Sequence, residues 1–287
     1  MSGTARGKSP ARHVLLVACA DGPGLIHRIT GVLFRHGLNI VENHEYVEKE
    51  SGTFTMRTEV DGDAPIATVA EELRRELPKG AEVSLHAQTP KRVVVLATKE
   101  SHCLGDLLLR HAAGELAATI PAVVSQYAEL APLVKRFEIP FHHVPAEGLE
   151  REAHEAELEK VIVPYAPEYL VLAKYMRVLT PGFVGKYRNR ILNIHHSFLP
   201  AFVGKNPYAQ AYARGVKIIG ATAHFVNEAL DEGPIITQSV IPVTHNQDAA
   251  TLARAGRDVE KIVLSRALRL LLEDRVIVRG QRTLVFE

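Results

Sequence analysis

The first part of the chain alternates short apolar runs with amphipathic segments. From His13 to Gln88 this pattern predicts strand, helix, strand, strand, helix and strand, at residues 13–19, 24–37, 38–47, 53–60, 65–77 and 81–87. Apolar residues at every second position indicate strands, and apolar residues three or four positions apart indicate helices. The order is typical of the split βαβ, ferredoxin-like layout.

The first helix of this segment carries signals at both ends. Asp21 is a candidate N-cap, Pro23 suits the first turn, and Gly37 suits the position just after the last turn. An apolar stripe at helical spacing runs between them, made of Leu25, Ile29, Val32 and Leu33. We expect this stripe to pack against the sheet.

Strands and helices alternate in the second part of the chain, at residues 92–98, 103–116, 120–126, 129–137, 168–175 and 190–197. Because its strands are almost continuously apolar, they predict a mostly parallel sheet that is covered on both faces, in an open α/β fold. A long amphipathic helix follows from about Asp248 to Leu272. Two short strands joined through Gly280 end the chain, and we expect them to pack against the domain.

These patterns divide the chain of 287 residues into two domains. We expect a flexible tail at residues 1–12, a small first domain at 13–88, a linker at 89–91 and a larger domain at 92–287. In open α/β sheets ligands bind beyond the carboxyl ends of the strands. The residues that close the strands of the second domain are therefore the first candidates for a functional site.

Composition and charge exclude several classes of function. Lys and Arg number 34 against 33 Asp and Glu, so the net charge of +1 favours neither nucleic acid nor an anionic membrane as a partner. Every apolar run is too short to span a membrane. The only cysteines, Cys19 and Cys103, have no metal or disulfide spacing. We expect a cytoplasmic protein without a metal site.

Polar side chains near the ends of two predicted strands suit attack on a carbonyl group. Alternation along a strand places Asn193 and His195 on one face and turns His196 to the other. Asp231 follows on a loop before Gly233. An amide can bind an oxyanion, an imidazole can donate a proton, and a carboxylate can orient water or raise the pKa of the imidazole.

The first domain resembles the ACT domain, a small amino-acid-sensing module. The similarity lies in Asp21, Gly22, Pro23, Gly24 and Leu25, followed by residues 30–33. It implies that Asp21, Gly22, Gly24 and Leu25 bind an effector, for which glycine and methionine are the first candidates. ACT domains often pair, so the resemblance also implies a homo-oligomer. The alternative is that these residues only form a tight turn and a helix cap.

The second domain resembles the folate-dependent formyltransferase catalytic domain. Residues 193–200, 215–231 and the following GPIITQ carry the resemblance, and Asn193, His195 and Asp231 match its catalytic motif. We expect His224, near the end of a predicted strand, to support Asp231 or the water, or to be a structural histidine at a strand end. Residues 174–179 resemble the segment that holds the pteridine. The folate-binding residues implied are Met176, Arg177, Leu179, Val226, Glu228 and Leu230.

The combination of these two domains resembles the formyltetrahydrofolate deformylases from about Ala11 to Glu287. The resemblance implies that 10-formyltetrahydrofolate is hydrolysed to formate and tetrahydrofolate. That reaction belongs to one-carbon metabolism and supplies formate for purine biosynthesis. Folate is then the substrate, and no cofactor is implied. The chain departs from the family pattern at Gln126 and Ala209, and neither residue is given a role.

Three alternatives remain open. Transfer of the formyl group to an amine such as glycinamide ribonucleotide requires a phosphate site, and the turn at residues 98–104 lacks glycine and carries Glu100, although Lys99 and His102 could bind phosphate. A cysteine hydrolase would use Cys103 with His102, but neighbours in sequence rarely face each other. A non-catalytic amino-acid-responsive regulator would not need an intact catalytic motif.

Overall fold

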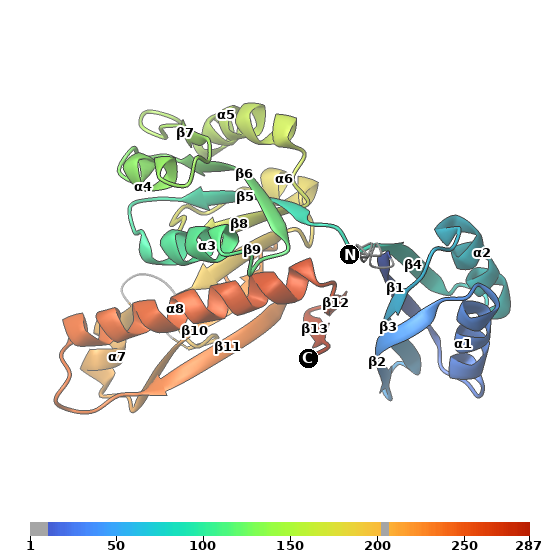
Figure 1. Ribbon diagram of the computed structural model, residues 1–287. Helices are drawn as coiled ribbons and strands as arrows, with labels where there is room; N and C mark the ends of the chain where they lie inside the picture. Colours follow the sequence, from blue (N-terminus) through green and yellow to red (C-terminus); the bar gives the residue numbers. More distant parts are fainter. Residues whose placement is uncertain (1–10, 202–206) are drawn as a thin grey trace, which may run out of the picture. The chain divides into compact units, whose positions relative to one another are not determined.

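The computed structural model describes residues 11–201 and 207–287 (Figure 1). It divides into two compact units between Thr89 and Pro90. Residues 1–10 of the predicted tail lie outside the described residues. Arg12, which the sequence assigns to the tail, is the first residue of a strand, and Lys91 is likewise the first residue of a strand and not a linker residue. None of the described helices is long and apolar enough to cross a membrane.

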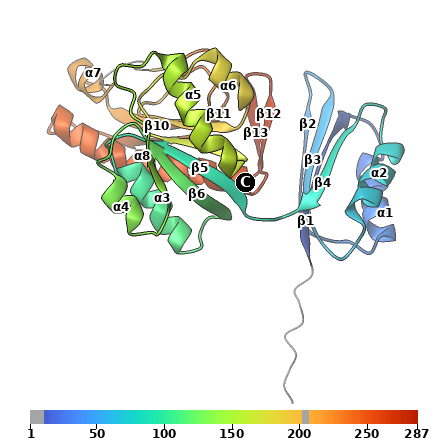
Figure 2. The ribbon, with the colours of Figure 1, turned by 90° about the horizontal axis from the view of Figure 1, so that it is seen from above.

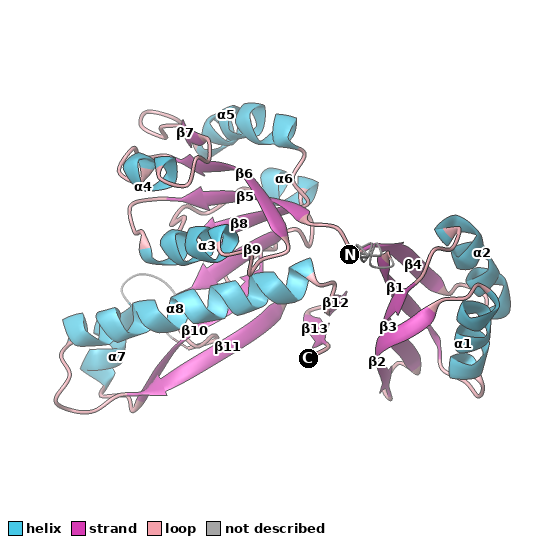
Figure 3. Ribbon diagram, viewed as in Figure 1, coloured by secondary structure: helices cyan, strands magenta, loops and turns pink. Residues whose placement is uncertain are grey.

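The first unit is the predicted ferredoxin-like domain. Its strands form one antiparallel sheet in the order β2-β3-β1-β4. Figure 3 shows both helices on the same face of this sheet, where the predicted stripe of α1 joins the core. In chain order the elements are β1 (Arg12–Ala20), α1 (Leu25–Arg35), β2 (Asn39–Glu48), β3 (Thr53–Asp61), α2 (Ile66–Glu76) and β4 (Glu82–Ala87).

The start of α1 differs from the prediction. Its N-cap is Gly24, with a φ of 81° in the left-handed region, and Asp21 lies too early in the chain to cap it. Pro23 also lies before the helix and not in its first turn, because α1 begins only at Leu25. The backbone N–H of Asp21 instead donates to Gly52 across the β2–β3 turn at 2.8 Å. Gly37 follows the last turn as predicted, with a φ of 68°.

The second unit contains the remaining elements. These are β5 (Lys91–Ala97), α3 (His102–Ala112), β6 (Ala118–Ser125), α4 (Ala131–Lys135), β7 (Phe141–His143), α5 (Arg151–Ile162), the 3₁₀ helix η1 (Val163–Tyr165), β8 (Tyr169–Ala173), α6 (Pro181–Lys186), β9 (Ile191–His195), α7 (Pro207–Arg214), β10 (Ile218–Phe225), β11 (Ile235–Pro242), α8 (Ala249–Leu272), β12 (Val276–Arg279) and β13 (Arg282–Val285).

The second unit is an open α/β domain with one sheet between two layers of helices (Figure 2). Its seven-stranded sheet has the order β11-β10-β9-β8-β5-β6-β7. Residues of α3, α4 and α8 form the apolar core on one face, and residues of α5 and α6 form the core on the other. The hairpin of β12 and β13 packs Val276, Val278 and Val285 against the first of these cores, as predicted.

The parallel character of the sheet ends at β9. Strands β7, β6, β5, β8 and β9 pair in parallel, whereas β10 is antiparallel to both β9 and β11. The carboxyl end of β10 therefore lies beside the beginning of β9. Ligands are expected beyond the carboxyl ends of the parallel strands. This expectation includes His195, which ends β9, but not His224 on the antiparallel strand β10.

Two leucines of α3 offer a test of this packing. Leu108 is fully buried in the core, and the neighbouring Leu109 is 63% exposed. We expect Leu108→Ala to lower the free energy of unfolding by about 2–5 kcal/mol, because a buried leucine leaves a cavity. Leu109→Ala should change it by about 0.5 kcal/mol or less. Urea denaturation followed by circular dichroism measures both, and equal effects would contradict the orientation of α3.

Candidate active site

Two polar side chains share one face of the central strand β9. Leu192 and Ile194 point into the core beneath α3 and α8, so Asn193 and His195 point to the opposite face. His195 closes the strand and is only 5% exposed. The alternation predicted from the sequence therefore places an amide and an imidazole side by side at the end of a parallel strand.

The loop after β10 folds back and carries Asp231 onto this face. The backbone N–H of Phe225 donates to the carbonyl of Pro234 at 2.9 Å, which closes the loop. A Cβ on Gly233 would stand 1.7 Å from the Phe225 carbonyl oxygen, so only glycine fits there. Asp231 itself has a φ of 58°. Its Oδ2 lies 3.2 Å from His195 Nδ1.

The Asp231 carboxylate is held in its charged form. Burial raises the pKa of Asp231, but the hydrogen bond and the electrostatic interaction with His195 act in the opposite direction, and the net pKa is lowered. Nδ1 of His195 therefore donates to a carboxylate. Among the described residues, Nε2 of His195 has no hydrogen-bond partner although it is buried. That nitrogen is available to a bound molecule.

His224 orients Asn193. Its Nδ1 lies 2.8 Å from the carbonyl oxygen of Phe225, which can only accept, so Nδ1 carries the proton. Burial lowers the pKa of His224, so the ring is neutral and its Nε2 accepts from the Asn193 amide at 3.1 Å. Oδ1 of Asp231 is 3.8 Å from the same nitrogen. An unprotonated nitrogen cannot donate to this carboxylate, so His224 acts on Asn193 and does not support Asp231 by a direct hydrogen bond.

The ring of His196 lies closer to the ring of His195 than alternation along a strand suggests. Strand β9 ends at His195, so the alternation does not extend further, and the two ring centroids are 5.2 Å apart. On its other side His196 faces the ring of Tyr208, at 6.2 Å. Burial, followed by the charge of Lys174, lowers the pKa of His196 to about 4. The ring is therefore neutral at neutral pH.

The residues that the resemblance assigns to folate lie on two loops beside this site. Met176 and Leu230 are exposed apolar side chains, at 61% and 56%. Leu179 and Val226 both pack against the apolar core that residues of α5 and α6 help to form. The backbone of Lys174 and Met176 adopts positive φ values of 61° and 59°, which holds the loop after β8 in a strained conformation. Glu228 is exposed on the Asp231 loop.

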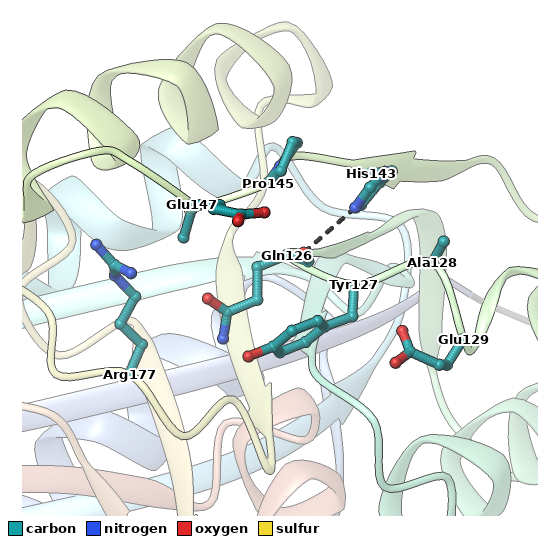
Figure 4. Close-up of a pocket in the computed structure, with 9 residues that line it drawn as sticks. Gln126, Tyr127, Ala128, Glu129, His143, Pro145, Glu147 and Arg177 are labelled. Atoms are coloured by element: carbon teal, nitrogen blue, oxygen red, sulfur yellow. Dashed lines mark hydrogen bonds between the residues drawn. The ribbon is translucent and has the colours of Figure 1, made fainter.

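Arg177 lines a cavity of about 550 Å³ near the ends of β6 and β7 (Figure 4). Its guanidinium donates to the Leu149 carbonyl at 3.3 Å. His143 also lines this cavity, and its Nε2 lies 3.2 Å from the Gln126 carbonyl. This cavity was not predicted from the sequence, although Gln126 follows directly after β6, and ligands are expected beyond the carboxyl ends of such strands. Ala209 lies exposed on α7, away from this cavity.

Asp231 also borders a second cavity of about 560 Å³. Leu199, Leu230 and residues of the β12–β13 hairpin line this cavity. The Asp231 side chain is 12% exposed. The carboxylate is therefore largely buried but remains accessible to water.

Cys103 does not have the environment of a nucleophile. It is fully buried, and burial followed by the negative charge of Glu260 raises the pKa of its thiol far above the ordinary value. Ligand atoms of His102, Cys103 and Glu260 lie within 4.8 Å of one another, a spacing that suits a metal ion. Glu260 already accepts a hydrogen bond from His102 and pairs with the Lys174 ammonium at 3.3 Å, so this group is an ion-pair network with a protonated thiol beside it.

The residues expected to bind an effector lie together at the start of α1. Asp21 and Gly24 are exposed, Gly22 is half-buried, and Leu25 is buried in the core of the first unit. They form the turn that meets the β2–β3 turn through the Asp21–Gly52 hydrogen bond. Leu25 therefore anchors this loop, and Asp21 and Gly24 are exposed to solvent.

Comparison with known proteins agrees with both domains. The family model described as Formyl transferase matches residues 91–268, and the ACT domain model matches residues 13–78. A formyltetrahydrofolate deformylase from Haemophilus influenzae is 53% identical over 96% of this chain and 99% of that protein. The chain belongs to the formyltetrahydrofolate deformylase family.

Solved structures of this family and of its transferase relatives have the same fold. A formyltetrahydrofolate deformylase from Pseudomonas syringae pv. tomato has a TM-score of 0.92 at 39% identity and covers 98% of this chain and 96% of that chain. A glycinamide ribonucleotide transformylase from Symbiobacterium toebii has a TM-score of 0.67 at 30% identity and covers 73% and 100%. The family and the transferases therefore share the second unit.

Substitution of Cys103 tests the chemistry of the site. We expect Cys103→Ala to keep kcat for formate release within about threefold of the original value, because a protonated, buried thiol takes no part in the reaction. The reaction is stopped at fixed times, and the amount of formate released gives kcat. Iodoacetamide should label neither cysteine of the native protein, since Cys19 and Cys103 are both buried. Loss of activity in a folded Cys103→Ala protein would restore the cysteine hydrolase hypothesis.

Proposed function

We propose that this chain hydrolyses 10-formyltetrahydrofolate to formate and tetrahydrofolate with Asn193, His195 and Asp231. The observation that supports these roles most directly is the contact of 3.2 Å between His195 and Asp231, with the Nε2 of His195 buried and without a hydrogen-bond partner among the described residues. A charged acceptor, a proton donor and an oriented amide together provide the groups that acyl transfer to water requires.

Asp231 positions the attacking water. Its carboxylate is charged, borders a water-accessible cavity and has Oδ1 free of any close donor in the described structure. As water attacks the N10-formyl carbon, its proton passes to Asp231. The carbonyl oxygen becomes an oxyanion in the same step.

Asn193 and His195 act on the developing charge. His224 accepts one amide hydrogen of Asn193, which leaves the second to donate to the oxyanion. Nδ1 of His195 is held by Asp231, and its Nε2 donates a proton to N10 as the C–N10 bond breaks. The proton on Asp231 then returns to His195. The products are tetrahydrofolate and formic acid, which loses its remaining proton to solvent as formate, and no electron acceptor or further cofactor is required.

The two loops beside the site hold the folate. Met176 and Leu230 offer exposed apolar surface and Leu179 and Val226 pack beneath the two loops, as a planar ring system requires. Arg177 and Glu228 are the polar members of this set. In this arrangement the formyl group points to the end of β9, between Asn193 and His195.

The turn after β5 argues against transfer to a phosphorylated amine. Lys99 pairs with Glu129 at 3.0 Å, and His102 directs its Nε2 to Glu260 at 2.7 Å. Glu100 stands next to the beginning of α3, where a phosphate would otherwise be favoured. Both candidate phosphate ligands are therefore engaged, and hydrolysis is the activity that the site supports best.

The first unit is the regulatory part in this proposal. All proposed catalytic groups lie in the second unit. The exposed turn of Asp21, Gly22 and Gly24, anchored by Leu25, is the proposed site for an amino acid such as glycine or methionine. Pairing of ACT domains would make the protein a homo-oligomer. Two free, buried cysteines agree with the reducing environment of the cytoplasm.

Replacement of Asp231 tests the catalytic role directly. We expect Asp231→Asn to lower kcat by about a hundredfold or more, because it keeps the size of the side chain but removes the charge that accepts a proton. His195→Ala and Asn193→Ala should have effects of similar size. Formate release and Tm are measured on the same samples. A structural aspartate would give the opposite result, with a lower Tm and an unchanged rate.

Replacement of Asp21 tests the regulatory role. We expect glycine or methionine to change the rate of formate release by the full-length protein, and Asp21→Ala to abolish that change without altering the basal rate. Asp63→Ala is the matched control, since Asp63 is another exposed acidic loop residue of the same domain. A response that survives in Asp21→Ala would place the effector elsewhere. Absence of any response to either amino acid in the original protein would remove this part of the proposal.

A further inference from the structure

The loop between β8 and α6, residues 174–180, carries three of the proposed folate-binding side chains, namely Met176, Arg177 and Leu179. Lys174 and Met176 of this loop have positive φ values of 61° and 59°. Residues other than glycine keep such values only where the surrounding structure holds them. The contacts at the two ends of the loop therefore decide where its side chains lie.

The beginning of the loop is fixed by the sheet and by the core. The hydroxyl of Thr98 donates to the carbonyl of Lys174 at 2.6 Å. The next side chain, Tyr175, is 2% exposed and lies in the apolar core that α5 and α6 help to form. Beyond it, Met176 and Val178 are both exposed. The middle of the loop is therefore open to solvent, and its course depends on how both ends are fixed.

The end of the loop is fixed by a buried carboxylate. Glu155 of α5 is 6% exposed, and its Oε1 accepts from the backbone N–H of Thr180 at 2.7 Å. The hydroxyl of Thr180 donates to Oε2 of the same carboxylate. That hydroxyl also accepts from the backbone N–H of Phe183 at 3.2 Å and so caps α6. Glu155 therefore binds both donors of Thr180, the residue at which the loop becomes a helix.

This contact reaches the proposed folate site through Leu179, which directly precedes Thr180 in the chain. Leu179 packs against the core on the face of the sheet that α5 and α6 cover (Figure 2). The hydrogen bonds of Glu155 in the described structure go to Thr180. The proposed catalytic residues lie on other elements, β9 and the loop after β10. Glu155 can therefore influence the folate without touching the reacting atoms.

We infer that Glu155 is a positioning residue, which fixes the folate-binding loop through Thr180 and so raises the affinity for the folate. The inference rests on the proposed assignment of Met176, Arg177 and Leu179 to the folate. A loop that is already fixed does not have to be ordered when the ligand binds, so less of the binding free energy is lost. The loop holds the folate equally before and during the reaction. Glu155 therefore affects KM and not kcat.

Replacement of Glu155 by glutamine tests this role. Both oxygens of Glu155 accept from Thr180, whereas the amide of glutamine has one acceptor oxygen. Glu155→Gln therefore keeps the size of the side chain but cannot keep both bonds. We expect KM for 10-formyltetrahydrofolate to rise at least about tenfold and kcat for formate release to stay within about threefold of the original value.

Two variants of Thr180 test the same contact from the other side. Thr180→Val keeps the branched shape but removes the hydroxyl, so KM should rise as it does in Glu155→Gln. Thr180→Ser keeps the hydroxyl, and KM should stay within about threefold of the original value. Glu152→Gln is the matched control, since Glu152 is an exposed glutamate of the same helix, and it should leave KM unchanged. If Glu155→Gln does not fold, the comparison of the two Thr180 variants gives the answer.

The measurements separate positioning from a purely structural role. Formate release by the full-length protein is followed over a range of 10-formyltetrahydrofolate concentrations, and isothermal titration calorimetry gives the Kd of tetrahydrofolate. In Glu155→Gln and Thr180→Val this Kd should rise together with KM. Tm is measured on the same samples. A glutamate that only stabilises the fold would reduce the amount of folded protein and with it the apparent kcat, whereas KM does not depend on the amount of active protein.

The inference and the proposed function fail in different ways. Folded Glu155→Gln and Thr180→Val proteins with unchanged KM and Kd would overturn the inference, while the proposed hydrolysis would stand. An original protein that binds tetrahydrofolate but releases no formate would overturn the proposed hydrolysis, and the Kd values of the variants would still decide the inference. An original protein that neither binds tetrahydrofolate nor releases formate would overturn both.

Discussion

The proposed site depends on the close approach of Gly233 to the backbone of Phe225. No side chain fits at position 233, because a Cβ would stand 1.7 Å from the Phe225 carbonyl oxygen. This approach and the Phe225–Pro234 hydrogen bond turn the loop after β10 back over the sheet. Without that turn Asp231 would not reach His195, and the imidazole would lack a charged partner.

Two buried carboxylates lie on opposite sides of the end of β9 and have different partners. Asp231 receives one hydrogen bond from His195 and borders a cavity, so its carboxylate can still accept a further hydrogen bond. Glu260 has both oxygens occupied by His102, Tyr208 and Lys174. A buried carboxylate is stable only when its partners compensate for the loss of water. The fully paired Glu260 therefore suits a structural role, and the partly paired Asp231 suits a chemical one.

The histidines near the site also differ in how many of their ring nitrogens are hydrogen-bonded. His224 is neutral and uses both nitrogens, one toward Phe225 and one toward Asn193. His195 uses only Nδ1 and keeps Nε2 free among the described residues. Residue type alone does not separate these two histidines. Their hydrogen-bond partners do, because a ring nitrogen already engaged in the protein is not available to a substrate.

The sequence by itself determined the order of elements in the first domain, the α/β class of the second and the shared face of Asn193 and His195, because periodicity and alternation are local properties of the chain. It did not predict α5, whose charged sequence has only four buried residues. The reversal of β10, the contact of His196 with His195, and the cluster around Glu260 were decided by the tertiary structure. Each of these joins residues far apart in the chain or depends on where a strand ends, so no local pattern encodes it.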